Sequence, residues 1–284
     1  MKVYRDLSSG LNKFKGKVDE KKVYSAWVSG DVDRVMQNVP WSDLRDDIGP
    51  ALEISASSLI ESGKLSLSGM LFGGNLGLRW DTTNPRVRDW IASRTAKNFT
   101  ELSDDSAQNI QRAVAASMNT ALTPRQVANR IKGSIGLLPR HADAVERYRQ
   151  NLLGTMSRDR AEKLSDAYAD KLLDYRAMMI GRTETRMATN AGQLSVWRAA
   201  ADQGFIDRHT TGKRWIVDGN PCEDCAPMHG VMVPIDSFFV MLDGSTVDFP
   251  PMDVHPHCEC GMEIVYDVAP DDFDDGNPEE EEEQ

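Results

Sequence analysis

The sequence predicts an α+β protein with a mainly helical body, a small zinc-stapled β module near the C-terminus and a disordered acidic tail. Apolar residues recur at helical spacing through most of residues 1–204. Residues 205–266 change to short alternating runs and hold all four cysteines of the chain. Residues 267–284 contain ten acidic and no basic side chains. We therefore expect four consecutive regions: an N-terminal helical region (1–100), a helical core (101–204), the metal-binding β module (205–266) and the tail (267–284).

Length and composition favour a globular protein of one large domain or two. The chain has 284 residues, of which 40% are hydrophobic. The net charge of −11 comes almost entirely from the tail, because the remaining 34 acids nearly balance the 33 lysines and arginines. Such a tail is either an interaction segment for a basic partner surface or a solvated end that aids solubility. The body shows no strong basic stripe of the kind that binds duplex DNA.

No segment is predicted to direct secretion or to cross a membrane. The N-terminus runs into polar residues without an apolar central region, and no apolar run approaches the roughly 18 residues that span a bilayer. We therefore expect no membrane partner and synthesis in a reducing cytoplasm. In that compartment, clustered cysteines indicate metal binding rather than disulfides.

The first hundred residues are predicted to be helical with one glycine-rich interruption. Near-helical spacing of apolar residues predicts amphipathic helices over residues 1–60, with an interruption at Pro40. Residues 62–80 contain five glycines and are predicted to form a flexible connection or a lid. None of the Gly-Lys pairs has the upstream glycine and the following hydroxyl of a Walker motif, so this loop is not predicted to hold phosphate.

The central helices carry clear start and stop signals. Thr123 and Gln126, with a proline between them, predict a capping box at the start of a helix. Helical propensity continues over residues 157–203, which would span about 70 Å if unbroken. We expect a break near Gly181, because such a helix is long for a compact domain, and an end at Gly204.

Three strands are predicted after the helices, and the cysteines lie between them. Alternating residues predict strands near 213–217, 231–233 and 261–266. A Cys-x-x-Cys pair precedes the second strand and a His-x-x-Cys-x-Cys run precedes the third. Two intervening residues let a tight turn aim both side chains at one ion. The candidate ligands are Cys222, Cys225, His255, Cys258 and Cys260.

This donor set is typical of a structural zinc site. Thiolates and imidazoles bind zinc at about 2.3 and 2.0 Å in a tetrahedron. Five candidate donors compete for four positions, which favours a closed site over a catalytic site with a position left for water. The spacing does not decide whether His255 or Cys260 is the fourth ligand. The alternative is a set of free thiols that pack as small apolar residues.

Several short motifs occur in a defined order along the second half of the chain. They are Ile180-Gly181-Arg182-Thr183-Glu184, Asn190-Ala191-Gly192, a helix end at Gly204, Trp215, the Cys222/Cys225 pair, Gly230 and the His255-to-Cys260 run. The series is similar to the phage head-morphogenesis family, the minor head proteins similar to protein F of phage Mu, and covers about residues 100–266. The family usually has an arginine between its last two cysteines, whereas this chain has Glu259. This difference argues against a basic contact from that position but does not affect the expected metal site.

The resemblance implies a structural protein that is not an enzyme. It implies a minor capsid protein of a tailed phage, made in the host bacterial cytoplasm and placed in the capsid interior near the portal, where it aids head assembly and, in some members, DNA ejection. The implied partners are the portal protein, the major capsid or scaffolding protein and phage genomic DNA. Residues 1–100, matched only by their helical character, would be the portal-docking part.

The resemblance also implies roles for particular side chains. The four cysteines and His255 would hold the metal, and Arg182 and Glu184 would form a buried polar pair that ties the long helix to the β module. The residues alone allow two other interpretations. Both side chains could serve helix capping and an internal ion pair, or Glu184 could be a catalytic acid without an evident partner.

Two other functions are compatible with parts of the sequence. A zinc deaminase shares the Pro-Cys-x-x-Cys element, but no upstream histidine is followed by the required x-Glu. A nucleic-acid-binding zinc module could use Arg208, Lys213 and Arg214, which lie near the cysteines in sequence. The module carries many acidic residues, however, and affinity for phosphate depends on the count of cations.

Overall fold

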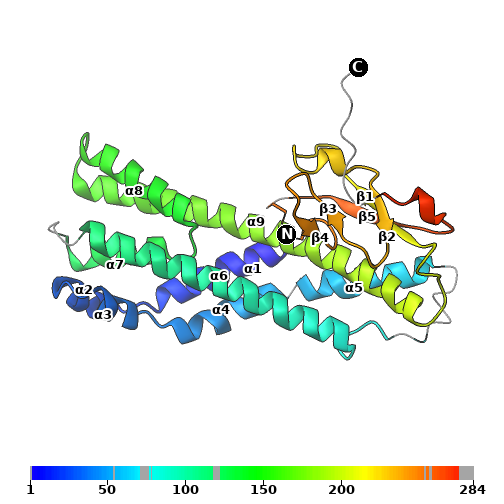
Figure 1. Ribbon diagram of the computed structural model, residues 1–284. Coiled ribbons are helices and arrows are strands. Elements are labelled where there is room, and N and C mark those ends of the chain that lie inside the picture. Colours follow the sequence, from blue (N-terminus) through cyan, green and yellow to red (C-terminus); the bar gives the residue numbers. More distant parts are fainter. Residues whose placement is uncertain are drawn as a thin grey trace, which may run out of the picture. The chain divides into compact units, whose positions relative to one another are not determined.

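The computed structural model describes residues 2–53, 55–70, 77, 79–117, 122–252, 254–255 and 258–274, and it confirms the α+β class (Figure 1). A mainly helical chain ends in a small sheet. Among the described residues, no helix is long and apolar enough to cross a membrane. The helices are α1 (Lys2–Gly16), α2 (Glu20–Val28), α3 (Val32–Gln37), α4 (Trp41–Glu53), α5 (Ser55–Gly69), α6 (Pro85–Ser117), α7 (Pro124–Ser134), α8 (Pro139–Leu153) and α9 (Arg158–Asp202).

The chain forms two compact units, and each is assembled from two separate stretches. Unit 1 contains residues 1–53 and 93–181, and unit 2 contains residues 54–92 and 182–284. These units differ from the four consecutive regions expected from the sequence. The difference arises because the first hundred residues supply core side chains to both units, Phe14 to the first and Trp80 to the second.

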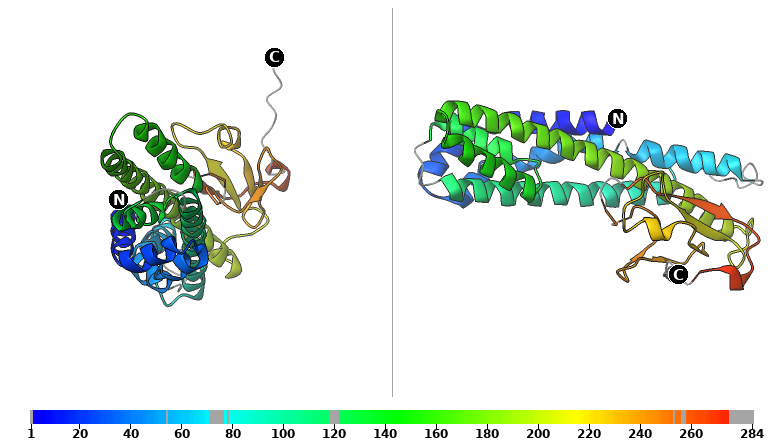
Figure 2. Two further views of the ribbon diagram at one scale, coloured as in Figure 1. Left: turned by 90° about the vertical axis from the view of Figure 1, so that its left-hand side faces the viewer. Right: turned by 90° about the horizontal axis from the view of Figure 1, so that it is seen from above.

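Unit 1 is a helical bundle built from α1 to α4, most of α6, α7, α8 and the first part of α9, which run alongside one another (Figure 2). The predicted capping box at the start of α7 is confirmed. The Thr123 hydroxyl accepts a hydrogen bond from the Gln126 backbone at 3.3 Å, and the Gln126 side chain accepts one from the Thr123 backbone at 3.0 Å. Buried leucine, isoleucine and valine side chains fill the space between these helices.

The predicted break near Gly181 is wrong, because α9 is continuous from Arg158 to Asp202. A glycine inside a helix costs about 1 kcal/mol relative to alanine. Here the missing side chain allows α1 to approach closely, since an added Cβ on Gly181 would lie 3.1 Å from the backbone nitrogen of Tyr4. Gly204 has a φ of 74° just after the helix, as a C-terminal cap requires.

The predicted glycine-rich loop begins later than expected. Residues 62–69 belong to α5, and the glycine at position 63 leaves room for the indole of Trp80, which an added Cβ would overlap. The Trp80 indole donates to the Leu59 carbonyl at 3.1 Å and so fixes this contact. The remaining glycines at 73 and 74 lie outside the described residues.

The β module of unit 2 contains a three-stranded antiparallel sheet and a separate two-stranded ribbon. The order in the sheet is β2-β1-β5, which confirms the three predicted strands, and β3 pairs with β4. Trp215 is fully buried in the sheet and meets Phe239 edge-on, with ring centroids 5.1 Å apart. The strands are β1 (Gly212–Ile216), β2 (Met232–Pro234), β3 (Phe239–Val240), β4 (Thr246–Val247) and β5 (Gly261–Val265).

The first part of the acidic tail, residues 267–274, is ordered, although the composition predicted disorder for the whole tail. Val268 is buried and its backbone donates to the Thr210 carbonyl at 2.9 Å. Asp274 donates from its backbone to the Met232 carbonyl at 2.8 Å. The expectation of disorder is therefore wrong for residues 267–274, because an apolar side chain and backbone hydrogen bonds hold them to the module. Residues 275–284 lie outside the described part of the chain.

Candidate metal centre

All five candidate ligands converge at one place in the β module. The Cys222 sulfur lies 2.9 Å and the Cys225 sulfur 3.3 Å from Nε2 of His255. The Cys225 and Cys258 sulfurs are 3.7 Å apart. Two groups could hold a metal ion, one of Cys222, Cys225 and His255 and one of Cys225, Cys258 and Cys260, and in each group the donor atoms lie within 4.8 Å of one another. Cys225 belongs to both groups and is the centre of the cluster.

The distances fit a tetrahedral ion with little movement. Four ligands at about 2.3 Å from a metal place two sulfurs roughly 3.8 Å apart along a tetrahedral edge. The Cys225–Cys258 separation of 3.7 Å matches this edge. The sulfur–nitrogen separations are somewhat shorter than the roughly 3.5 Å expected for a mixed edge, so the cluster would open slightly around an ion.

One backbone turn and the segment just before β5 aim the sulfurs inward. Backbone groups of Cys225 and Ala226 donate to the Cys222 carbonyl at 3.2 and 2.9 Å, which closes the first turn. The Cys225 backbone also donates to the Cys222 sulfur at 3.3 Å. Cys258 and Cys260 stand just before β5, and two-residue spacing in extended chain places both side chains on one side.

Three of the sulfurs are crowded in a buried position. Cys225, Cys258 and Cys260 expose 3% of their surface or less. Hydrogen bonds from the Cys225 and Cys258 thiols lower the pKa of Cys260, and contact with Cys258 and Cys260 raises the pKa of Cys225. One thiolate is therefore favoured and a second is opposed by its neighbours. A divalent cation bound between the sulfurs would offset this repulsion. Several thiolates could then lie close together, as they do in zinc sites.

The buried polar pair expected from Arg182 and Glu184 is contradicted at Arg182, which lies at the surface. Glu184 is buried, with 2% of its surface exposed, whereas Arg182 is exposed. Both lie in α9, and side chains two positions apart on a helix do not face each other.

Asn190 connects the helix to the cysteine loop instead. Its side-chain amide donates to the Cys260 carbonyl at 3.0 Å and to the Pro250 carbonyl, and the residue is 1% exposed. Two positions further along α9, Gly192 allows α5 to pack closely, since an added Cβ would collide with the Leu59 carbonyl. Helix periodicity marks such positions as buried, but it does not indicate which carbonyl an amide will reach.

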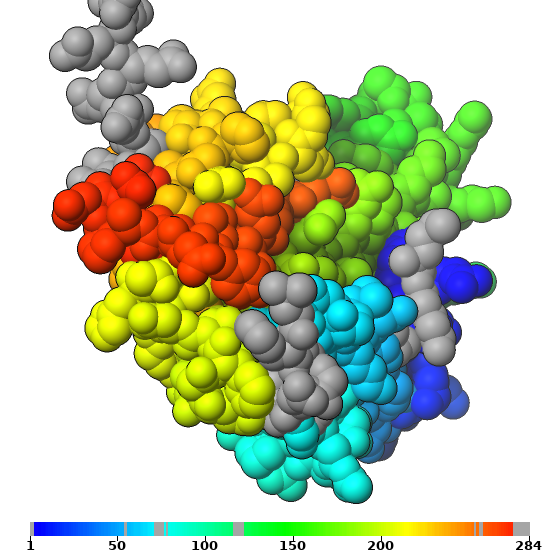
Figure 3. All heavy atoms as spheres, turned by 90° about the vertical axis from the view of Figure 1, so that its right-hand side faces the viewer, coloured from blue at the N-terminus to red at the C-terminus, as the bar shows by residue number. Residues whose placement is uncertain are grey.

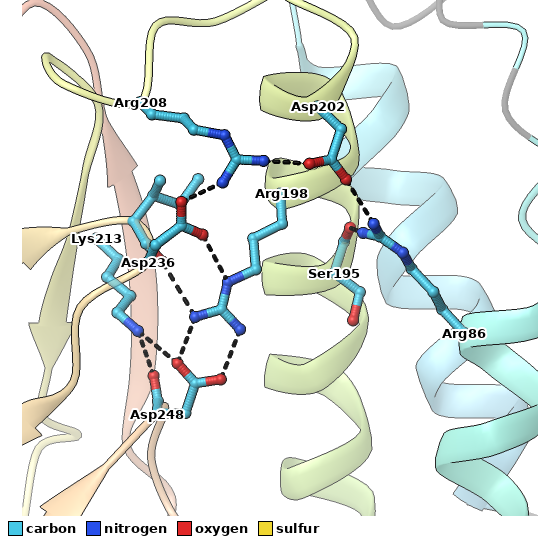
Figure 4. Close-up of polar contacts among 9 residues, drawn as sticks. Arg86, Ser195, Arg198, Asp202, Arg208, Lys213, Asp236 and Asp248 are labelled. Carbon is cyan, nitrogen blue, oxygen red and sulfur yellow. Dashed lines mark hydrogen bonds and ion pairs between the residues drawn. The ribbon is translucent and has the colours of Figure 1, made fainter.

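A second polar connection involves Arg198 and was not predicted as such. Its guanidinium binds the Asp248 carboxylate through two nitrogens, each at 2.6 Å (Figure 4). Lys213, which is fully buried, donates to the same carboxylate at 2.8 Å and to the Asp248 carbonyl at 2.6 Å. Burial lowers the pKa of Lys213 to about 8, although Asp248 acts in the opposite direction.

The cations considered for phosphate binding already have carboxylate partners. Arg208 pairs with Asp236 and Asp202 (Figure 4), and Arg214 pairs with Glu263 at 2.7 Å. Lys213 is buried against its own carboxylate. The structure therefore does not support the sequence-based idea that these three side chains form a phosphate-binding surface.

No family model, curated protein or solved structure matches this chain.

Proposed function

We propose that this chain is a structural minor capsid protein of a tailed phage, and that a zinc ion bound by the Cys/His cluster stabilises its β module. The proposal rests on the ordered motifs of the head-morphogenesis family and on one spatial observation. Asn190, from the motif in the long helix, donates to the carbonyl of Cys260, from the last cysteine motif. Elements 70 residues apart in the sequence thus meet at one junction.

Zinc is the metal that best suits this donor set. Mixed thiolate and imidazole ligands in a tetrahedral arrangement are characteristic of structural zinc. The protein offers one more donor than a tetrahedron needs, so no position remains for a water molecule or a substrate. The ion would then contribute to folding by joining the two cysteine-bearing segments of the β module.

Metal content tests the zinc part of the proposal. Elemental analysis of the full chain, purified without chelator, should find one zinc per chain, and Cys258→Ser should lower both the metal content and the free energy of unfolding. Absence of metal from the parent protein would leave the cysteines as packed thiols and would contradict the proposed role.

Composition of purified particles tests the phage part. In DNA-filled heads of the phage that encodes the chain, mass spectrometry should detect it in far fewer copies than the major capsid protein. Its absence from such particles would refute the assignment.

Portal docking by the first hundred residues needs surface variants rather than a deletion. Deleting residues 1–100 would remove core side chains from both units, so loss of binding would only report unfolding. Val28 and Leu65 are exposed by 61% and 67% and can each be changed to glutamate. We expect one of these changes to weaken co-purification with the portal protein, whereas Leu164→Glu, an exposed position outside this region, should not. Equal binding of all three variants would contradict docking through these surfaces.

A further inference from the structure

The three-stranded sheet has two edges, and the edge formed by β2 is fully blocked. Backbone bonds from Trp215 to Val231 at 2.9 Å and from Ile235 to Thr211 at 3.1 Å show that residues 231, 233 and 235 face β1. Residues 232 and 234 therefore point outward. Both backbone groups of Met232 are bound by Asp274, and Pro234 has no N–H, while its carbonyl accepts from Ser237 at 2.9 Å.

The opposite edge, formed by β5, is open. Residues 211, 213 and 215 direct their backbone groups toward β2. The alternate residues of β1 therefore face β5, where 212 pairs with 265, 214 with 263 and 216 with 261. The backbone N–H and C=O groups of Met262 and Ile264 therefore point away from the sheet. Within the part of the chain that the structure describes, these groups have no hydrogen-bond partner. An unpaired row of this kind is a template for another strand.

The surroundings of this edge are acidic. Residues 258–274 contain six acids and no lysine or arginine. Five of the acids are exposed, and the segment from 261 to 274 lies at the surface in Figure 3. Arg214, which lies opposite Glu263 on the neighbouring strand, is already paired with that carboxylate. Tyr266, with 42% of its surface exposed, adds an aromatic side chain beside the strand.

We propose that the outer edge of β5 binds an extended, positively charged segment of a partner protein, which adds a fourth strand to the sheet. Main-chain hydrogen bonds to Met262 and Ile264 would supply affinity, and alternate side chains of the segment would supply specificity. Lysine or arginine at those positions would meet the acidic side chains around the edge.

A second copy of this chain is a poor occupant of the edge. Antiparallel pairing of β5 with itself about residue 263 would place Glu263 directly opposite its counterpart, and like charges in that position are destabilising. The surrounding acids would add to the repulsion. The inference does not depend on the proposed metal or on the phage assignment, because it rests on strand register and charge alone.

Binding of a defined peptide to the full-length protein tests the inference. The probe is a fluorescein-labelled peptide with alternating lysine and valine, measured by fluorescence anisotropy. We expect saturable binding that weakens with added salt, and slower amide exchange at Met262 and Ile264 in the complex. A peptide with glutamate in place of lysine should bind at least tenfold more weakly.

A proline substitution separates edge binding from general charge attraction. Ile264→Pro removes an outward N–H that takes no part in the ladder, so the sheet should tolerate it, whereas the peptide affinity should fall about tenfold or more. Ile264→Val keeps the N–H and serves as the matched control. If the proline variant fails to fold by circular dichroism, a double variant, Glu263→Gln with Asp267→Asn, tests the charge contribution and should weaken binding.

Several results would overturn the inference. These are the absence of saturable binding, equal binding of the acidic peptide, and affinity unchanged in a folded Ile264→Pro protein. A concentration-dependent dimer that disappears in Ile264→Pro would show that a second copy of the chain occupies the edge instead.

Discussion

Replacing Cys225 should damage the metal centre more than replacing Cys222. Cys225 belongs to both groups of donors and lies 3.3 Å from the imidazole of His255 and 3.7 Å from the sulfur of Cys258. Serine has nearly the same shape as cysteine and is a poor zinc ligand, so it removes the donor and little else. After Cys222→Ser, four donors remain close together; after Cys225→Ser, the two groups lose the atom that they share.

The size of the effect follows from the energetics of small zinc sites. Binding of structural zinc contributes on the order of 10–16 kcal/mol, which is roughly 2.5–4 kcal/mol for each of four ligands. Loss of Cys225 should therefore lower zinc affinity by about a hundredfold or more, since each 1.4 kcal/mol is tenfold. Loss of Cys222 should cost less, because Cys260 can complete the tetrahedron beside Cys258 and His255.

The assay is a chelator competition on the full-length parent and the two variants, followed by urea unfolding of each metal-loaded protein. Cys225→Ser should lose zinc at the lowest chelator concentration and unfold at the lowest urea concentration. Equal loss in both variants would show that Cys222 is an obligatory ligand and that Cys260 is the spare donor. Full retention of zinc by Cys225→Ser would refute the central position assigned to this sulfur.

Further predictions concern the polar groups that hold the module. Asp248→Asn should lower the free energy of unfolding by about 3–5 kcal/mol in urea titrations, because it leaves the buried Lys213 ammonium without its carboxylate. Asp243→Asn, at an exposed position, is the control and should change the free energy of unfolding little. Similar values for the two variants would contradict the role of Asp248. The folded pKa of Lys213, about 8, lies below the unfolded value of about 10.4, so the folded state releases its proton first. Stability should consequently rise with pH between those values, and a rise of the same size in Lys213→Met would refute this assignment. Asn190→Leu should weaken zinc retention about tenfold or more by freeing the Cys260 carbonyl, whereas unchanged retention in chelator competition would show that this contact does not orient the ligands.

Local signals explain what the sequence could predict. The Thr123 capping box, the strands and the convergence of Cys222 with Cys225 all depend on residues within a few positions of one another. The wrong expectation of a break at Gly181 shows the limit of such signals. A glycine in a helical pattern has the same appearance whether it ends the helix or accommodates a neighbouring backbone, and only the position of Tyr4 distinguishes the two.

The contacts that could not be predicted all join distant parts of the chain. Asn190 reaches a carbonyl 70 positions away, and Arg198 reaches a carboxylate 50 positions away. The sequence allowed Lys213 to be part of a surface for nucleic acid, because it lies near the cysteines and lysine side chains are usually exposed. Its burial depends on the ribbon that carries Asp248, and no pattern near Lys213 indicates that the ribbon will cover it.

These long-range contacts also fix separate parts of the β module to one helix. Asn190 and Arg198 lie on the same helix, and both use their side chains to bind loops of the β module. The cysteine loop and the β3–β4 ribbon are therefore each fixed to α9 by buried or half-buried polar groups. The donors of the cysteine cluster lie against one another, and Arg208, Lys213 and Arg214 are paired with carboxylates. Polar contacts within the module and to α9 thus hold the cysteine loop and the ribbon in one position relative to the helix.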